Sequence, residues 1–262
     1  MVVYISTVAM QVSCHTAQRI NRADGGNDMR PAIDGVTPAS IQQGLARVRE
    51  EISVAAARSG RSESDVHVLA AVKYVDAAAC AHLIGAGVLD LAENRLAQLV
   101  DRQDAAIVPD AARWHFIGRL QSREAAQVAD RVGTIHTLCT ESAAKRLAAG
   151  SSRPRLLVQV NVDDDPAKDG LAPEDVERFL LELPAELEVR GFMAMPAFTD
   201  NPEQSRGAFA ALRELRDRLA PRREGRHRLE SLSIGTSQDY AVAVEEGATH
   251  VRLGRTLYGG EE

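Results

Sequence analysis

The sequence predicts one closed barrel of eight parallel β-strands that alternate with α-helices, preceded by an additional N-terminal helix. From Ser40 onward, short apolar runs alternate with segments of helical periodicity. Each of the eight apolar runs is separated from the next by enough residues for a helical crossover, the connection that joins parallel strands. A region of roughly 220 residues also has the size of a compact (β/α)8, or TIM-type, barrel. An open doubly wound sheet built from the same elements is the alternative.

The expected strands are 66–72, 88–92, 114–117, 134–138, 156–162, 188–194, 230–234 and 249–253. The first helix is expected to begin at a Ser40 cap, because apolar residues then recur at spacings of three and four. Pro173 and Pro202 are expected to begin two later helices. Residues 38–262 therefore form one predicted domain. Residues 1–37 are expected to be a disordered extension, because they turn polar and glycine-rich and lack the basic start of a secretory signal.

Composition narrows the function classes. A formal net charge of −6 argues against a nucleic-acid partner, which usually requires a basic surface. The sequence holds no apolar run long enough to cross a bilayer. The three cysteines are few and far apart, which predicts a reducing, cytoplasmic setting. The seven histidines show no metal-binding spacing, so we expect no metal site.

The first strand ends in a lysine within an apolar run, Val68-Leu69-Ala70-Ala71-Val72-Lys73. Lysine occurs only at positions 73, 145 and 168, whereas arginine supplies the remaining basic residues. In a barrel of this type, functional groups lie at the carboxyl ends of strands. An amine held there is a candidate nucleophile towards an aldehyde. The simpler interpretation is a strand-end lysine that extends to solvent.

The last two strands end in turns that predict a phosphate site. Strand 7 leads into Gly235-Thr236-Ser237, where a helix is expected to begin, and strand 8 leads into Arg252-Leu253-Gly254. Backbone amides, hydroxyl groups and a helix N-terminus favour a dianion, and barrels of this type bind phosphate after strands 7 and 8. With Lys73 on the neighbouring first strand, the ligand would carry a phosphate and a carbonyl. Pyridoxal 5′-phosphate (PLP) fits, and so does the sugar phosphate of a lysine aldolase.

Other strand ends carry weaker signals. Glu93-Asn94-Arg95 follows strand 2 and is compatible either with a helix cap or with polar groups in the barrel mouth. His115 lies between two aromatic residues, where a histidine is more often a core residue than a catalyst. The aspartates at 163–165 predict a solvated loop, because adjacent carboxylates cannot all face one cation.

Taken together and in this order, the segments resemble the pyridoxal phosphate homeostasis protein family, over roughly residues 40–260. The matching pieces are Leu69-Ala70-Ala71-Val72-Lys73, Glu93-Asn94-Arg95, Trp114-His115-Phe116-Ile117-Gly118, Leu120-Gln121-Ser122, Gln159-Val160-Asn161, Gly191-Phe192-Met193, Leu232-Ser233-Ile234-Gly235 with Ser237, and Val251-Arg252-Leu253-Gly254. The resemblance implies a barrel like the N-terminal domain of alanine racemase, which is the type III fold of PLP proteins.

The resemblance also implies roles for single residues. Lys73 would hold PLP as a Schiff base, and the phosphate would be surrounded by Gly235, Ser237, Arg252 and Gly254. Asn94 and His115 would line the ring pocket. The chain departs from the family at three positions near the site, where Arg255 replaces a small hydroxyl residue, Thr236 a methionine and Tyr74 a threonine. A side-chain contact between residue 255 and the phosphate is therefore not expected.

The family implies a non-catalytic PLP carrier that works as a monomer or weak dimer and passes PLP transiently to apo-enzymes. The enzymatic alternative is an amino-acid racemase. Inverting a stereocentre is simplest with two opposed acid–base groups, and only Lys73 is a convincing one in this sequence. For Tyr258, packing at the end of the barrel is the favoured interpretation.

Overall fold

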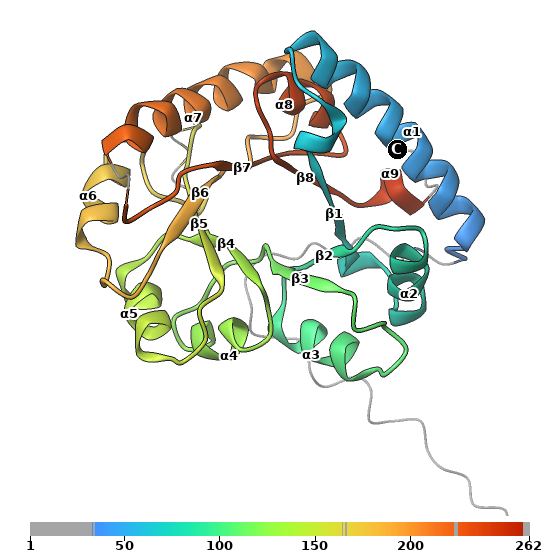
Figure 1. The fold of residues 1–262 in the computed structure, drawn as a ribbon, viewed down its shortest axis with the longest axis horizontal. Helices are drawn as coiled ribbons and strands as arrows, with labels where there is room; N and C mark the ends of the chain where they lie inside the picture. The colour runs from blue at the N-terminus through green and yellow to red at the C-terminus, as the bar shows by residue number, and fades with distance from the viewer. Residues whose placement is uncertain (1–32, 34, 164, 166, 223–224, 259–262) are drawn as a thin grey trace, which may run out of the picture. The chain divides into compact units, whose positions relative to one another are not determined.

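The computed structural model describes residues 33, 35–163, 165, 167–222 and 225–258. Within them, eight parallel strands form a closed barrel in chain order, and β1 pairs with both β2 and β8. Figure 1 shows this ring of strands from one end. The strands are β1 (His67–Ala71), β2 (Asp90–Glu93), β3 (Arg113–Phe116), β4 (Thr134–Leu138), β5 (Arg155–Gln159), β6 (Val189–Met193), β7 (Ser231–Thr236) and β8 (His250–Leu253).

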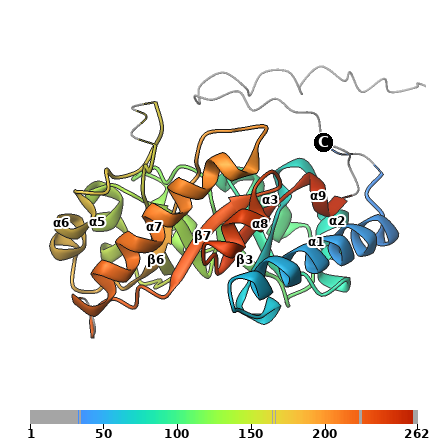
Figure 2. The same cartoon turned by 90° about the horizontal axis from the view of Figure 1, so that it is seen from above.

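Helices surround the strands, as Figures 1 and 2 show from two directions. Their apolar faces supply much of the core, for example Leu212 and Leu215 on the longest crossover helix, α7. The α-helices are α1 (Pro38–Arg58), α2 (Ala77–Gly85), α3 (Leu96–Asp104), α4 (Ala125–Ala129), α5 (Glu141–Ala149), α6 (Val176–Glu182), α7 (Arg206–Leu219), α8 (Tyr240–Glu245) and α9 (Arg255–Tyr258). Short 3-10 turns include η2 (Val72–Tyr74) and η3 (Pro202–Ser205).

All eight expected strands are present, and the open-sheet alternative is wrong because β8 closes on β1. Strand 5 is shorter than expected: it ends at Gln159, and Val160 forms only an isolated bridge with Leu171. The loop after β5 folds back here, so this apolar run does not continue as a strand. Helix α6 begins at Val176 rather than at Pro173, and Pro202 begins η3 immediately before α7.

Helix α1 lies against the barrel between α8 and α2 (Figure 1). Its cap is Thr37 rather than Ser40. The Thr37 hydroxyl accepts from the Ser40 amide, and Ser40 sits at the third helical position in a reciprocal capping box. A β-carbon at Gly44 would lie 2.7 Å from the carbonyl oxygens of Thr256 and Leu257. Glycine therefore lets α1 approach α9 closely.

The segment before α1 reaches the carboxyl end of β1. Ile33 packs partly buried against the core, and its amide donates to the Tyr74 carbonyl at 2.9 Å. The sequence predicts a disordered extension over residues 1–37. Residues 1–32 and 34 of this range lie outside the described part of the chain.

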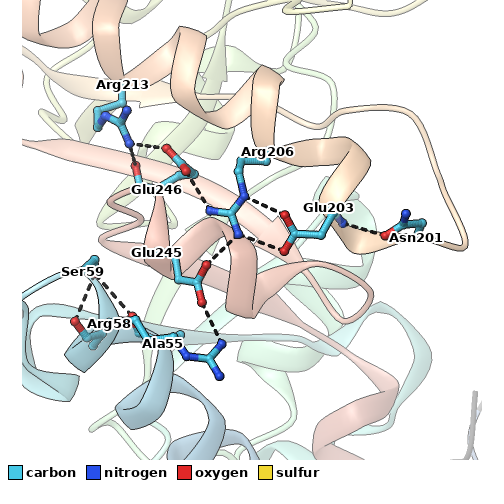
Figure 3. Close-up of polar contacts among 10 residues, drawn as sticks. Ala55, Arg58, Ser59, Asn201, Glu203, Arg206, Arg213, Glu245 and Glu246 are labelled. Carbon is cyan, nitrogen blue, oxygen red and sulfur yellow. Dashed lines mark hydrogen bonds and ion pairs between the residues drawn. The ribbon is translucent and has the colours of Figure 1, made fainter.

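An ion-pair network joins α8 to the helices on either side of it (Figure 3). The Arg206 guanidinium of α7 contacts Glu203, Glu245 and Glu246, whereas Arg58 at the end of α1 contacts Glu245 at 3.1 Å. Arg213 also pairs with Glu246. Linked pairs of this kind contribute more to stability than isolated surface pairs do. The network therefore fastens both neighbouring helices to α8.

The barrel interior is unusually polar. Barrels of this type are filled mainly by branched apolar side chains. Here His115, His136, Ser233 and Arg252 are all buried, and the His250 ring lies 5.9 Å from the His136 ring, centroid to centroid. Burial lowers the pKa of His136, and it lowers the pKa of His250 to about 3. Both imidazoles are therefore neutral at neutral pH.

Because of these two histidines, we expect the free energy of unfolding to fall on acidification. Because their pKa values are depressed in the folded chain, the unfolded chain binds more protons below about pH 6.5, and folding stability declines as pH decreases. Each histidine contributes a slope of about 1.4 kcal/mol per pH unit between the unfolded value and its own folded value. Urea unfolding at about pH 7 and about pH 5 measures the slope. A His250→Gln variant should lose about half of it, whereas equal slopes would contradict this assignment.

Among the described residues, no helix combines the length and the hydropathy that a bilayer-spanning segment needs. No cluster of three His, Cys, Asp or Glu side chains in the described part of the chain is arranged to hold a metal ion.

Candidate functional site

Lys73 lies in η2, directly after β1, at the carboxyl end of the barrel. The backbone on both sides of it is fixed by hydrogen bonds. The Arg102 guanidinium of α3 donates to the carbonyl oxygens of Val72 at 2.8 Å and Val75 at 2.7 Å. The Tyr258 hydroxyl of α9 donates to the Ala71 carbonyl at 2.9 Å. Side chains of α3 and α9 therefore hold the lysine loop in place.

Arg102 is itself positioned by Glu93, at the carboxyl end of β2. Their side chains approach to 2.6 Å, and the Glu93 side chain is fully buried. Burial raises the pKa of Glu93, while Arg102 and the amides of Asn94 and Arg95 oppose this rise. Glu93 thus accepts from these two amides as well as from the guanidinium. Glu93 therefore fixes the start of α3 directly and, through Arg102, the lysine loop.

Tyr74 brings the ends of β1 and β8 together. The Lys73 Nζ lies 4.7 Å from the centroid of the Tyr74 ring, and the Arg255 Cζ lies 5.9 Å from it. Two cations therefore contact the same aromatic ring. Arg255 lies beside the lysine loop, because β8 pairs with β1, so this departure from the family pattern adds positive charge near Lys73.

The two predicted glycine turns are neighbours: Gly235 lies near the end of β7, and Gly254 directly follows β8. The Gly254 amide lies 3.4 Å from the Ser237 hydroxyl oxygen, which joins the two predicted phosphate-binding segments. Buried Asp239 fixes the first turn, because its carboxylate accepts from the Thr236 amide at 2.7 Å and from Ser205 at 2.9 Å. A β-carbon on Gly254 would have only the Ala71 carbonyl oxygen, at 4.0 Å, for a near neighbour. Open space therefore lies beside the Gly254 backbone.

The expectation that a helix begins near Ser237 is wrong. Residues 237–239 form a turn, and α8 begins at Tyr240 with Asp239 at its N-cap. The turn is needed because the Asp239 carboxylate reaches back to the Thr236 amide, which holds this stretch out of the helix. The groups available to an anion at this position are therefore backbone amides and hydroxyl groups rather than a helix N-terminus.

Arg252 points into the barrel rather than across its mouth. Its guanidinium donates to the Ser233 carbonyl at 2.5 Å, the Ser233 hydroxyl at 2.9 Å and the Ala194 carbonyl at 2.9 Å. Burial lowers its pKa to about 10, so the side chain remains a cation at neutral pH. Arg252 therefore joins β8 to β7 and to the end of β6, below the turn that contains Gly254.

His115 and Asn94 occupy different depths. The His115 ring nitrogens contact His136 at 3.0 Å and Asp90 at 3.1 Å inside the barrel. Asn94 follows the end of β2, and its side-chain oxygen is buried without a hydrogen-bond partner, as is the corresponding oxygen of Asn161 after β5. Buried polar atoms without a protein partner are rare, and a water molecule or a ligand is one way to satisfy them. The two asparagines fit a polar ligand at the carboxyl end of the barrel.

Of the predicted site residues, the described contacts connect Ser237 with Gly254, and Tyr74 connects Lys73 with the residue after Gly254. They place His115 and Arg252 deeper, in the barrel interior. Sequence reasoning missed Arg102, Asp239 and His136. An arginine on an amphipathic helix, an aspartate in a turn and an interior histidine show no distinctive pattern, because each depends on a partner far along the chain.

Gly235 provides a test of the first turn. Its φ is +87°, and a β-carbon there would lie 2.6 Å from Ala243 Cβ and 3.0 Å from Tyr240 Cα. Gly235→Ala is therefore expected to destabilise the protein by about 2–4 kcal/mol through strain and overpacking. Gly207→Ala is the control, because nothing lies within 4 Å of a β-carbon there and the residue is helical. Urea unfolding compares the two, and equal stabilities would contradict the strained geometry.

Comparisons with known proteins agree with the fold. The family model described as alanine racemase, N-terminal domain, matches residues 44–262. The pyridoxal phosphate homeostasis protein of Aquifex aeolicus is 37% identical over 222 residues, which cover 82% of this chain and 96% of the relative. The protein of that name from Pseudomonas aeruginosa is 35% identical over 231 residues, covering 86% and 97%.

Solved structures give the same picture. PipY of Synechococcus elongatus, solved without PLP, has a TM-score of 0.73 at 29% identity and covers 84% of this chain and 100% of its own. The structure of PipY with PLP bound has a TM-score of 0.70 at 28% identity, with the same coverage.

Proposed function

Because the chain belongs to the pyridoxal phosphate homeostasis protein family, we propose that it binds PLP at the carboxyl end of the barrel and holds it through Lys73. The observation that carries the proposal is the placement of the Lys73 loop beside the β8 turn, through Tyr74 and Arg255. When bound, PLP supplies an aldehyde that condenses with a primary amine as water leaves.

The residues around Lys73 would orient its amine. The Glu93–Arg102 pair and Tyr258 hold the backbone from Ala71 to Val75, so the amine projects from a fixed loop. Positioning a reacting group in this way removes much of the entropic cost of forming a bond. The Tyr74 ring, which Lys73 and Arg255 both contact, would shield one side of the amine from water.

For the phosphate, we propose the two glycine turns. The Ser237 hydroxyl and the Gly254 amide share only a long contact, so both donors can turn to an anion. Gly235 allows the first turn to form, and Arg255 adds a cation at the rim. Asn94 would lie beside the ring.

Two of the predicted site residues lie deeper in the barrel than their sequence positions suggested. Arg252 would bound the site from inside the barrel as a cation. His115 would support it from below, because both of its ring nitrogens are engaged by interior side chains.

We further propose that the protein holds PLP and releases it to apo-enzymes by transient contact, rather than acting as a racemase. Tyr258 is the tyrosine nearest the end of the chain, and its hydroxyl is buried and bonded to the Ala71 carbonyl. Burial raises its pKa far above neutral, so it would not serve as a second proton-transfer base opposite Lys73. Incubation with D- and L-amino acids should give no racemisation, and turnover would contradict this part of the proposal.

The phosphate site is tested by comparing PLP with pyridoxal, which lacks the phosphate. We expect Ser237→Ala to weaken PLP binding about tenfold or more, because one hydrogen bond to a charged group contributes about 1.5–3 kcal/mol. The affinity for pyridoxal should not change. Absorbance titration of the apo-protein measures both affinities. Equal weakening of the two ligands would show that Ser237 supports the fold and does not contact the phosphate.

A further inference from the structure

A chain of hydrogen bonds crosses the barrel interior from Arg252 to Asp90. The Arg252 guanidinium contacts the Ser233 hydroxyl at 2.9 Å, and this hydroxyl contacts His136 Nδ1 at 2.9 Å. His136 Nε2 then contacts His115 Nδ1 at 3.0 Å, and His115 Nε2 contacts an Asp90 carboxylate oxygen at 3.1 Å. The five residues come from five strands, in the order β8, β7, β4, β3 and β2, and every one of them is buried.

The two ends of the chain dictate its direction. Hydrogen bonds from His115 and Arg113 hold the pKa of Asp90 well below its usual range, against the opposing effect of burial, so its carboxylate can only accept. His115 therefore carries its proton on Nε2 and accepts on Nδ1 when neutral. His136 must then donate through Nε2 and accept from the Ser233 hydroxyl, whose oxygen accepts from Arg252.

Every donor in the chain thus points from the buried cation towards the buried carboxylate. The neutral state of His136 preserves this order, since protonation would put a second donor against the Ser233 hydroxyl. Two further histidines face this region: the His250 ring lies 6.5 Å from the His115 ring, and the His67 ring stacks on the His250 ring at 5.0 Å. Arg155 acts electrostatically on His250, and Asp239 acts on Arg252. Neither histidine interrupts the chain of contacts.

The outer end of the chain reaches the amino-terminal end of the barrel. Asp90 is held there by a bidentate contact with Arg113, at 2.7 Å for both bonds. Asp90, Arg113 and His67 line a pocket of about 230 Å³. The chain therefore links an anchored ion pair at one end of the barrel to a cation just below the opposite end.

If these five side chains only filled the barrel interior, burying them would cost more free energy than burying apolar side chains. Burying polar groups is unfavourable unless each is paired, and apolar side chains would fill the same space with less penalty. A fully paired network, by contrast, holds its members in one arrangement. The remaining N–H groups of Arg252 are then fixed in direction as well, because its guanidinium contacts the Ser233 carbonyl and hydroxyl in β7 and the carbonyl of Ala194 directly after β6.

We infer that this chain is a positioning device, in which His136 and Ser233 hold the Arg252 guanidinium in a single orientation at the base of the PLP site. That Arg252 faces a PLP site is taken from the proposed function, and the inference rests on it in this respect. It adds His136, Ser233 and Asp90 as positioning residues that contact no ligand themselves. Loss of His136 would leave Arg252 cationic but would release the Ser233 hydroxyl, one of the three contacts that orient the guanidinium.

The direction of the chain can be tested without any ligand. Nitrogen NMR of the histidine rings in the free protein distinguishes the two neutral tautomers. We expect both His136 and His115 to carry the proton on Nε2. A proton on Nδ1 of His136 would overturn the inference, because this tautomer would donate to Ser233 and reverse the order of the bonds.

The effect on the cofactor site is tested by two substitutions at one position. His136→Leu removes both contacts, whereas His136→Gln retains one acceptor and one donor. We expect the leucine variant to bind PLP roughly tenfold to a hundredfold more weakly and to shift the absorption band of the bound cofactor. The glutamine variant should bind within about threefold of the wild type and keep the band position.

His227→Leu is the matched control. This buried histidine contacts the Val189 amide and the Leu180 carbonyl, away from the chain. It should lower stability without moving the absorption band. If His136→Leu binds PLP with the affinity and band position of the wild type, the positioning role alone is overturned. Failure of the wild type to bind PLP would overturn the proposed function, while the tautomer measurement would still decide the direction of the chain.

Discussion

A Lys73→Ala variant is expected to lose the visible absorbance that the wild-type protein develops with PLP. The side chain contacts the Tyr74 ring from a loop fixed by other residues, so its removal should leave the fold intact. PLP would then bind only through its phosphate and ring, without a covalent link. Absorbance spectra at saturating PLP measure the loss, and thermal unfolding of both proteins measures whether the fold is retained.

Two controls separate the amine from the charge. Lys73→Arg keeps a cation beside Tyr74 but cannot condense with an aldehyde, so it should lose the band as well. Lys145→Ala removes an exposed lysine whose partner is Glu141 on the same helix, and it should retain the full band. A band of normal intensity in Lys73→Arg would contradict the role of the amine.

Arg102→Leu is expected to produce the largest loss of stability. It leaves the buried Glu93 carboxylate without its cation and removes the donors to the Val72 and Val75 carbonyls. Breaking a buried ion pair from one side costs about 3–5 kcal/mol. PLP capture should weaken too, because the loop that carries Lys73 is no longer held. Urea unfolding and PLP titration measure the two effects.

A double variant separates these effects. Adding Glu93→Gln to Arg102→Leu removes the unpaired charge, while the new amide oxygen can still accept from the Asn94 amide. Stability should recover in part, but PLP capture should not, because the two loop carbonyls still lack a donor. Arg131→Leu breaks a more exposed pair with Asp104 and should change stability by no more than about 1 kcal/mol. Equal losses in Arg102→Leu and Arg131→Leu would contradict the account of this pair.

The strands and their parallel order could be predicted because apolar runs and crossover lengths are local signals. Helix starts were less predictable. Thr37 rather than Ser40 caps α1, and Asp239 delays α8, because a cap depends on which side chain meets which free amide. An apolar run can also leave the sheet early, as the one after Gln159 does when the loop folds back to pair Val160 with Leu171.

The candidate site shows the same division. The positions of Lys73, Ser237 and Gly254 at strand ends follow from the barrel pattern itself. The depth of Arg252 does not, because strand alternation leaves open whether a side chain near the mouth points up or into the barrel. The partners that hold the site, such as Arg102 for the lysine loop and His136 for Arg252, come together only in the folded chain.

Borohydride reduction of the PLP-loaded wild-type protein, followed by mass mapping of its peptides, tests the central claim most directly. Reduction makes the bond between lysine and cofactor permanent, so the modified residue can be identified. The account predicts one phosphopyridoxyl group, on the peptide that contains Lys73. Modification of Lys145 or Lys168 with Lys73 left unmodified would contradict it.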